Sequence, residues 1–145
     1  MSTSTDTHPT IFPALRYRDA DAAIAFLKNA FGFTEHAVHR SDAGVVEHAE
    51  LQLGDGMIML GQHRDNGSIQ PQAADAFASP MTIYVVTDDP DALHAKAVAG
   101  GAEIVRGLED QSYGSRDFGA RDLDGNVWWF GTYSPYAVQP EPTSA

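Results

Sequence analysis

The sequence predicts an α+β fold made of two βαβββ modules in tandem, and the first indication is an internal repeat. Residues 54–61 (GDGMIMLG) match residues 124–131 (DGNVWWFG) at an offset of 70 residues. Identical residue types also occur at positions 19 and 89, 21 and 91, 22 and 92, 53 and 123, and 61 and 131. A repeat of this length indicates one supersecondary unit used twice. Two sheet-forming units that face each other would enclose a cleft, which is where we expect a binding site.

The second indication is that both halves of the chain predict the same order of elements. The first half predicts a strand at 11–17, a helix at 20–30, a strand at 34–40 and a hairpin of 45–53 with 56–62. The second half predicts a strand at 81–87, a helix at 89–99, a strand at 102–106 and a hairpin of 116–123 with 126–133. We therefore place modules at 10–62 and 80–133 of a single domain (10–133), with a linker at 63–79. The segments 1–9 and 134–145 are expected to be flexible tails.

Capping and turn residues support these bounds. Asp19 and Asp88 precede the two helices and are expected to cap their first turns. The Asp-Gly pairs at 55–56 and 124–125 are strong signals for two-residue hairpin turns. Because a turn sets the register of its hairpin, these pairs also predict which side chains share a face.

The composition excludes several classes of function. The chain has 145 residues, the size of one domain, and 43% of them are hydrophobic. It has no cysteine, which removes disulfides and thiolate sites and fits a reducing cytoplasm. The formal net charge of -11 argues against nucleic acid, whose binding needs basic residues. No run approaches the roughly 18 apolar residues of a membrane span, and the N-terminus lacks the features of a signal peptide.

The alternation of side chains along a strand sorts the hairpin residues onto two faces. One face is expected to pack under the helices, and it comprises Ala49, Leu51, Leu53, Ile58 and Leu60 in the first hairpin and Leu123, Trp128 and Phe130 in the second. The other face is mixed, and it comprises Val46, His48, Glu50, Gln52, Met57 and Met59 in the first hairpin and Arg116, Phe118, Ala120, Asp122, Trp129 and Tyr133 in the second. Apolar walls with a few polar groups are typical of small-molecule sites, so we expect the mixed faces to line a shared cleft.

Two motifs carry a resemblance to a known family. Residues 18–33 (RDADAAIAFLKNAFGF) contain the first helix, and residues 122–130 (DLDGNVWWF) form the turn and last strand of the second hairpin. Within tandem βαβββ units over residues 10–133, these motifs resemble the vicinal oxygen chelate superfamily, which includes glyoxalase I, bleomycin-resistance proteins and extradiol dioxygenases. The resemblance implies the fold and leaves the function open, because this fold hosts many chemistries.

The resemblance also implies where metal-dependent members would hold their ion. The corresponding positions here are Phe12, Met59, Thr82 and Trp129. Phe and Trp side chains offer no lone pair to a metal, a Met thioether is a poor ligand for hard divalent ions, and a Thr hydroxyl is a weak one. We therefore expect neither a metal nor another cofactor, as in the bleomycin-resistance branch.

The function that the sequence favours is metal-independent binding of a small planar or aromatic molecule, for example drug sequestration of the bleomycin-resistance type. Stacking on aromatic rings would supply much of the affinity. The residues expected to contact this ligand are Phe12, Tyr84, His48, Glu50, Gln52, Met57, Met59, Arg116, Phe118, Trp129 and Tyr133. We also expect a homodimer, because closed twofold symmetry is the commonest form of oligomer.

Several polar residues leave alternative functions open. His48 and Glu50 lie two residues apart on one face, so they form either a cofactor-free proton-transfer pair or, together with His63, a relocated metal site of a lyase or dioxygenase. Arg116 would hold a carboxylate or phosphate of the ligand, or form an internal salt bridge with Asp122 or Glu50. A third alternative is an interaction module that takes a peptide in its groove.

Overall fold

A computed structural model describes residues 9–63 and 82–136, which form two four-stranded sheets and the helices that cover them. The first module comprises β1 (Ala14–Tyr17), α1 (Ala20–Phe26), the π-helical turn η1 (Leu27–Phe31), β2 (Thr34–Arg40), β3 (Val46–Leu53) and β4 (Gly56–Gln62). The second module comprises β5 (Thr82–Val86), α2 (Pro90–Ala99), β6 (Glu103–Asp110), β7 (Arg116–Arg121) and β8 (Val127–Gly131). The predicted α+β fold is therefore confirmed, whereas the predicted linker and tails lie mostly outside the described residues.

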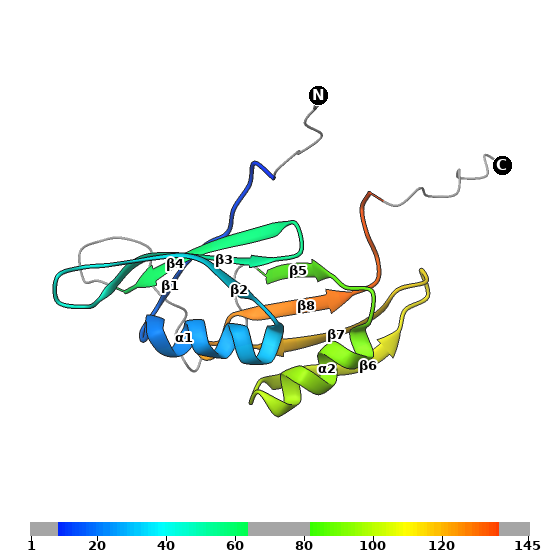
Figure 1. The fold of residues 1–145 in the computed structure, drawn as a ribbon. Coiled ribbons are helices and arrows are strands. Elements are labelled where there is room, and N and C mark those ends of the chain that lie inside the picture. Colours follow the sequence, from blue (N-terminus) through cyan, green and yellow to red (C-terminus); the bar gives the residue numbers. More distant parts are fainter. Residues whose placement is uncertain (1–8, 64–81, 137–145) are drawn as a thin grey trace, which may run out of the picture.

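Both sheets follow the same order of strands. Sheet A has the order β1-β4-β3-β2, and sheet B has the order β5-β8-β7-β6. In each sheet the first strand of the module runs parallel to the last one, and the other pairs are antiparallel. The last strand of each module, β4 or β8, thus lies inside its sheet with hydrogen-bonded partners on both sides. Figure 1 shows α1 and α2 on the same side of the sheets.

Capping side chains fix where the helices begin. The Asp19 carboxylate accepts a hydrogen bond from the backbone N–H of Ala22 at 3.0 Å, as expected. The cap of α2 is Asp89, so the prediction of Asp88 was wrong by one residue. Pro90 causes this shift, because it occupies the first helical position and the cap must directly precede it. In the part of the chain that the structure describes, no helix combines the length and the apolar character needed to cross a membrane.

The helix-facing sides of both sheets share one core. Phe31, at the end of η1, has its ring centroid 4.8 Å from that of Phe130 and 5.5 Å from that of Trp128. Both partners lie on β8 of the second module and are fully buried. Buried aromatic pairs of this kind contribute large areas of apolar contact. The first module's helix therefore completes the core of the second, and Trp128 marks the helix-facing side of β8.

A buried carboxylate links the two modules at the loop between β7 and β8. Asp122 accepts hydrogen bonds from Tyr17 Oη at 2.6 Å and from Trp128 Nε1 at 3.0 Å. It also accepts from the backbone N–H groups of residues 124 and 126, both at 3.0 Å. Burial, and then the neighbouring charge of Asp122, raise the pKa of Tyr17 well above its ordinary value. The DLDGN motif thus stabilises the junction of the modules. The prediction that Asp122 faces a ligand cleft was wrong.

Candidate functional site

The predicted site residues divide between two faces, one on each sheet. We call the side of a sheet that turns away from the helices its open face. The open face of sheet A carries His48, Glu50, Gln52, Met57 and Met59. The open face of sheet B carries Tyr84 and Trp129, which are paired neighbours on β5 and β8. Tyr133 follows β8, and its carbonyl oxygen accepts a hydrogen bond from Tyr84 Oη at 2.7 Å. Phe12 precedes β1 and is exposed.

Phe118 and Arg116 lie on the helix-facing side of β7, so the prediction that they share a face with Trp129 was wrong. Phe118 is fully buried and stacks on Phe130, with the ring centroids 5.1 Å apart. Arg116 forms a salt bridge with Asp91 of α2, with 2.7 Å between Nε and Oδ1. Three further residues that were expected on the mixed faces are also buried, namely Val46, Ala120 and Asp122.

The length of the second hairpin loop explains this error. Arg121 of β7 pairs with Val127 of β8, so the loop contains residues 122–126 instead of a two-residue turn at 124–125. The register therefore shifts by one residue, which moves every side chain of the strand to the other face. In the first hairpin Leu53 pairs with Gly56, a shift of two residues that leaves the predicted faces unchanged. Leu123, which was expected to pack under the helices, lies exposed in the longer loop.

Trp129 lies flat against the neighbouring strand at the centre of the open face of sheet B. A Cβ atom on Gly119 of β7 would come within 2.5 Å of the indole ring, so this position has room for glycine alone. The guanidinium carbon of Arg106 lies 4.6 Å from the ring centroid, in cation–π geometry. On the neighbouring strand β5, Tyr84 pairs with Trp129 and adds a second ring to this face, with its hydroxyl close to Gly131 of β8. The face therefore presents a flat aromatic ring with a protein cation over it.

Sequence reasoning missed two charged residues beside this ring. Arg106 Nη2 lies 2.5 Å from Oδ1 of Asp117, whose side chain is almost completely buried. Asp117 also accepts hydrogen bonds from Gln111 Nε2 at 3.1 Å and Tyr113 Oη at 3.3 Å. Partial burial, and then the charge of Asp117, raise the pKa of Tyr113. The register error hid Asp117, which falls on the open face once β7 is shifted by one residue. No pattern in the sequence distinguishes Arg106.

The open face of sheet A carries a polar pair instead of an aromatic surface. His48 Nε2 lies 2.9 Å from Glu50 Oε2, as the two-residue spacing predicts. His36 of β2 approaches the same carboxylate, with 3.8 Å between Nε2 and Oε1. The hydrogen bond from His48 and the neighbouring histidine charges lower the pKa of Glu50. Met59 lies directly across from Glu50 on β4. This arrangement has the groups required for proton transfer to a bound molecule.

The relocated metal site is not assembled. His63 follows the end of β4, where its backbone N–H donates to the carbonyl oxygen of Tyr17 at 2.8 Å. Across residues 9–63 and 82–136, no group of three or more His, Cys, Asp or Glu side chains could hold a metal ion. Of the positions implied for a metal, Met59 and Trp129 lie at equivalent places on β4 and β8. Their side chains do not fit a hard divalent ion, because neither supplies an oxygen or imidazole ligand.

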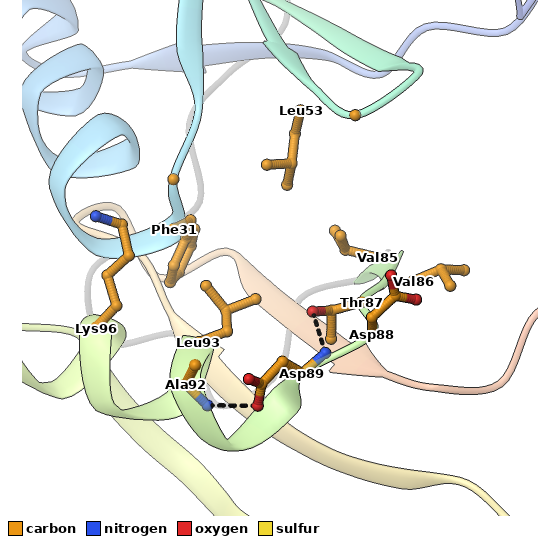
Figure 2. Close-up of a pocket in the computed structure, with 12 residues that line it drawn as sticks. Phe31, Leu53, Val85, Val86, Thr87, Asp88, Asp89, Ala92, Leu93 and Lys96 are labelled. Atoms are coloured by element: carbon orange, nitrogen blue, oxygen red, sulfur yellow. Dashed lines mark hydrogen bonds between the residues drawn. The ribbon is translucent and has the colours of Figure 1, made fainter.

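Two adjoining grooves lie between the modules, at the tip of the β3–β4 hairpin. One has a volume of about 510 Å³ and is lined by Met57 and Tyr84, one residue from each open face. The other has a volume of about 450 Å³ and lies between this hairpin and the start of α2. Figure 2 shows Leu53 and Leu93 pointing into it from opposite walls, with Asp88 at its end. Grooves of this size suit drug-sized molecules.

Known proteins share both the sequence pattern and the fold. The sequence profile of the Glyoxalase/Bleomycin resistance protein/Dioxygenase superfamily matches residues 8–130. The chain belongs to this superfamily. Uncharacterised proteins of Mycobacterium bovis and Mycobacterium tuberculosis are 31% identical to it over 130 residues. These matches cover 87% of this chain and 84% and 75% of the two relatives. Membership confirms the family resemblance of the DLDGN motif and the first helix.

Among solved structures, TioX from Micromonospora sp. ML1 is 27% identical and superposes with a TM-score of 0.72. The match covers 89% of this chain and all of TioX. The fosfomycin resistance protein FosX from Mesorhizobium loti is 17% identical, with a TM-score of 0.62, over 90% of this chain and 96% of FosX. The similarity to FosX shows the fold alone.

Proposed function

We propose that the chain binds a small planar organic molecule on the open face of sheet B, without a metal ion. The observation that carries this proposal is the flat position of the Trp129 indole over Gly119, inside the sheet and away from the core. Tyr84, which is 40% exposed, adds a second ring on the neighbouring strand. Offset stacking of a planar ligand on such rings gains both dispersion and burial of apolar area.

The side chains at the family's metal positions support binding without metal. Phe12, Met59 and Trp129 offer a divalent ion no oxygen or imidazole ligand, and the hydroxyl of Thr82 is a weak one. We expect the purified protein to contain no stoichiometric divalent ion. Treatment with a chelator should leave its thermal midpoint unchanged. A drop of several degrees after chelation would contradict this part of the proposal.

Sequestration of a drug is the form of this function that we favour, because it requires affinity and no reaction. Burial of aromatic faces at about 25 cal/mol per Å² can supply much of that affinity. The superfamily description names bleomycin resistance proteins, and one structure with the same fold is named a fosfomycin resistance protein. These names belong to those proteins, and they support a binding role here only through the shared fold.

Titration with 2-naphthamide, a neutral planar probe, tests the proposal through quenching of tryptophan fluorescence. We expect Trp129→Ala to weaken binding by about 1–3 kcal/mol, because the stacking surface is lost. The matched control is Trp128→Phe, which changes the adjacent, helix-facing residue and should leave the quenching in place. Equal affinity of the Trp129 variant and the wild type would contradict the proposal.

A cofactor-free acid–base enzyme is the second candidate, and the 2.9 Å contact between His48 and Glu50 favours it. Glu50 would orient His48, whose imidazole would take a proton from a molecule bound on sheet A. The α-protons of hydroxyacetone in D2O provide a probe, because their exchange is visible by NMR. We expect His48→Gln to reduce the exchange to the uncatalysed rate, whereas Trp129→Ala should not affect it. Exchange that is no faster with the wild-type protein than without protein would remove this candidate.

We further propose that the protein forms a homodimer. Large apolar side chains remain exposed beside the larger groove, including Ile11 at 85% and Tyr136 at 96%. Groups of exposed apolar residues commonly mark contact surfaces. Light scattering at micromolar concentration should give twice the chain mass of 15.6 kDa. A mass equal to that of one chain would refute the dimer.

A further inference from the structure

The open face of sheet B already holds a cation, which is supplied by the protein itself. The Arg106 guanidinium lies over the Trp129 ring, 4.6 Å from its centroid, and contacts the Asp117 carboxylate at 2.5 Å. An indole face and a carboxylate are the two groups that proteins combine to bind organic cations. The Arg106 side chain therefore shows which kind of chemical group this part of the face accommodates.

The carboxylate is built into the fold independently of Arg106. Asp117 is only 3% exposed, and Gln111 and Tyr113 also donate hydrogen bonds to it. A Cβ atom on Gly131 would lie 2.7 Å from the Asp117 Cβ atom and 2.8 Å from Tyr84 Oη, so glycine provides the space that this cluster occupies. A buried carboxylate is costly unless it is paired with a cation, which means that this position attracts one.

The charges around the ring favour a cationic ligand over an anionic one. Glu109 Oε1 lies 3.6 Å from Arg106 Nε, so two carboxylates face one guanidinium. Arg121, on the same side of β7, is paired with Glu103 at 3.5 Å. The whole chain has a formal net charge of -11. An approaching anion would therefore meet a guanidinium whose charge is already balanced, in a negative surrounding field.

We infer that the open face of sheet B recognises an organic cation, and that Arg106 occupies the ligand's place until the ligand displaces it. The aromatic part of the ligand stacks on Trp129, and its ammonium or amidinium group takes over the contact with Asp117. Tyr113, which is 63% exposed, lies at the rim of this position and contributes another ring. This inference rests on the proposed function and narrows it to planar molecules that carry a positive charge.

Three naphthalene probes with the same ring and different charges test the inference. They are (2-naphthylmethyl)trimethylammonium, neutral 2-naphthamide and anionic 2-naphthoate, each titrated calorimetrically. We expect the cation to bind the wild-type protein about tenfold more tightly than the amide. In Arg106→Gln the affinity for the cation should rise by about another tenfold, because its place is no longer occupied. Arg121→Gln removes the same charge from the same face and should change the affinity much less.

The outcomes separate the inference from the proposed function. Tightest binding of 2-naphthoate, or loss of cation binding in Arg106→Gln, would overturn the inference and leave planar binding at Trp129 in place. Equal affinities for the three probes, all lost in Trp129→Ala, would also overturn the inference and leave planar binding at Trp129 in place. Failure of all three probes to bind would overturn the proposed function and the inference with it. Asp117→Asn provides a second readout: in a folded variant, confirmed by circular dichroism, the preference for the cation should disappear.

Discussion

The open faces of the two sheets occupy equivalent positions in the fold and differ in their chemistry. Met59 and Trp129 hold the same place on β4 and β8, 70 positions apart. Glu50 lies across from Met59, whereas Gly119 lies across from Trp129. One face therefore presents a carboxylate beside a flexible thioether, and the other presents a flat indole with room to lie on its neighbour. Two copies of one unit have kept the same backbone while the side chains on their open faces have diverged.

The largest expected loss of stability distinguishes the two sides of β8. Trp128→Ala should lower the free energy of unfolding by about 3–5 kcal/mol, because it empties a fully buried site. Trp129→Ala, one residue further along, should cost less than half as much, since its ring lies on the open face. Urea unfolding followed by far-UV circular dichroism measures both values. The reverse order would mean that the two faces of β8 have been exchanged.

The next largest loss of stability is expected from breaking the hydrogen bond between Tyr17 and Asp122, which links the modules. Tyr17→Phe should cost about 1.5–3 kcal/mol, the typical value for a hydrogen bond to a charged group. Because the folded-state pKa of Tyr17 lies above its ordinary value of 10.0, its contribution is present below pH 10 and is lost as the pH rises through the folded pKa. The wild type should therefore lose stability above pH 10 more steeply than the Phe variant. Tyr136→Phe, at an exposed position, is the control and should behave as the wild type.

A smaller loss of stability is expected when the space that Gly119 leaves under the Trp129 indole is filled. Gly119→Ala should cost about 1–3 kcal/mol, because the new methyl group would overlap the Trp129 ring and force it away from the strand. The equivalent change on sheet A is Glu50→Ala, which should be close to neutral because the side chain is partly solvated. Urea unfolding and the near-UV circular dichroism of tryptophan measure the two results. An unchanged spectrum in the Gly119 variant would contradict the close packing.

The smallest effect belongs to the polar pair on sheet A. The pKa of Glu50 is lowered by His48, so the stabilisation from this pair is present above the ordinary value of 4.5 and is lost as the pH falls through the lowered pKa. Solvent screens the pair, so the change in stability should be close to the error of the measurement. The pKa itself is the better readout. An NMR titration of Glu50 in His48→Gln should show its pKa returning towards 4.5, and an unchanged pKa would refute the coupling.

The sequence was sufficient to predict the helices and strands, because local signals determine them. The 70-residue repeat and the turn residues predicted both modules, and β2 begins and ends at the predicted residues 34 and 40. β6 was predicted too short, since its second part, after Gly107, has no alternating pattern. The face on which each strand residue lies depended on the length of the hairpin loop. In the first hairpin the observed register differs by two residues from the one that the Asp-Gly pair predicted, so the side chains keep their predicted faces. In the second hairpin it differs by one residue, so the side chains change face.

Long-range contacts explain most of what the sequence could not predict about the site. Nothing near Asp122 in the chain indicates that Tyr17 donates to it, because the two residues meet only when both modules have folded. The same holds for Arg106 and Trp129, which lie on different strands and meet across β7. The residues that were correctly placed on the open faces, such as Glu50 and Met59, are those whose face follows from alternation along one well-registered hairpin.

The hydrogen bond between Tyr17 and Asp122 joins residues that are 105 positions apart. If two chains exchanged a module, each would break this bond within itself and remake the same bond with its partner. The energy of the junction would then be equal in the exchanged and unexchanged forms. The balance between them would be set by chain entropy and by the effective concentration of one module around the other. Protein concentration during folding, rather than side-chain chemistry at the junction, would decide which form accumulates.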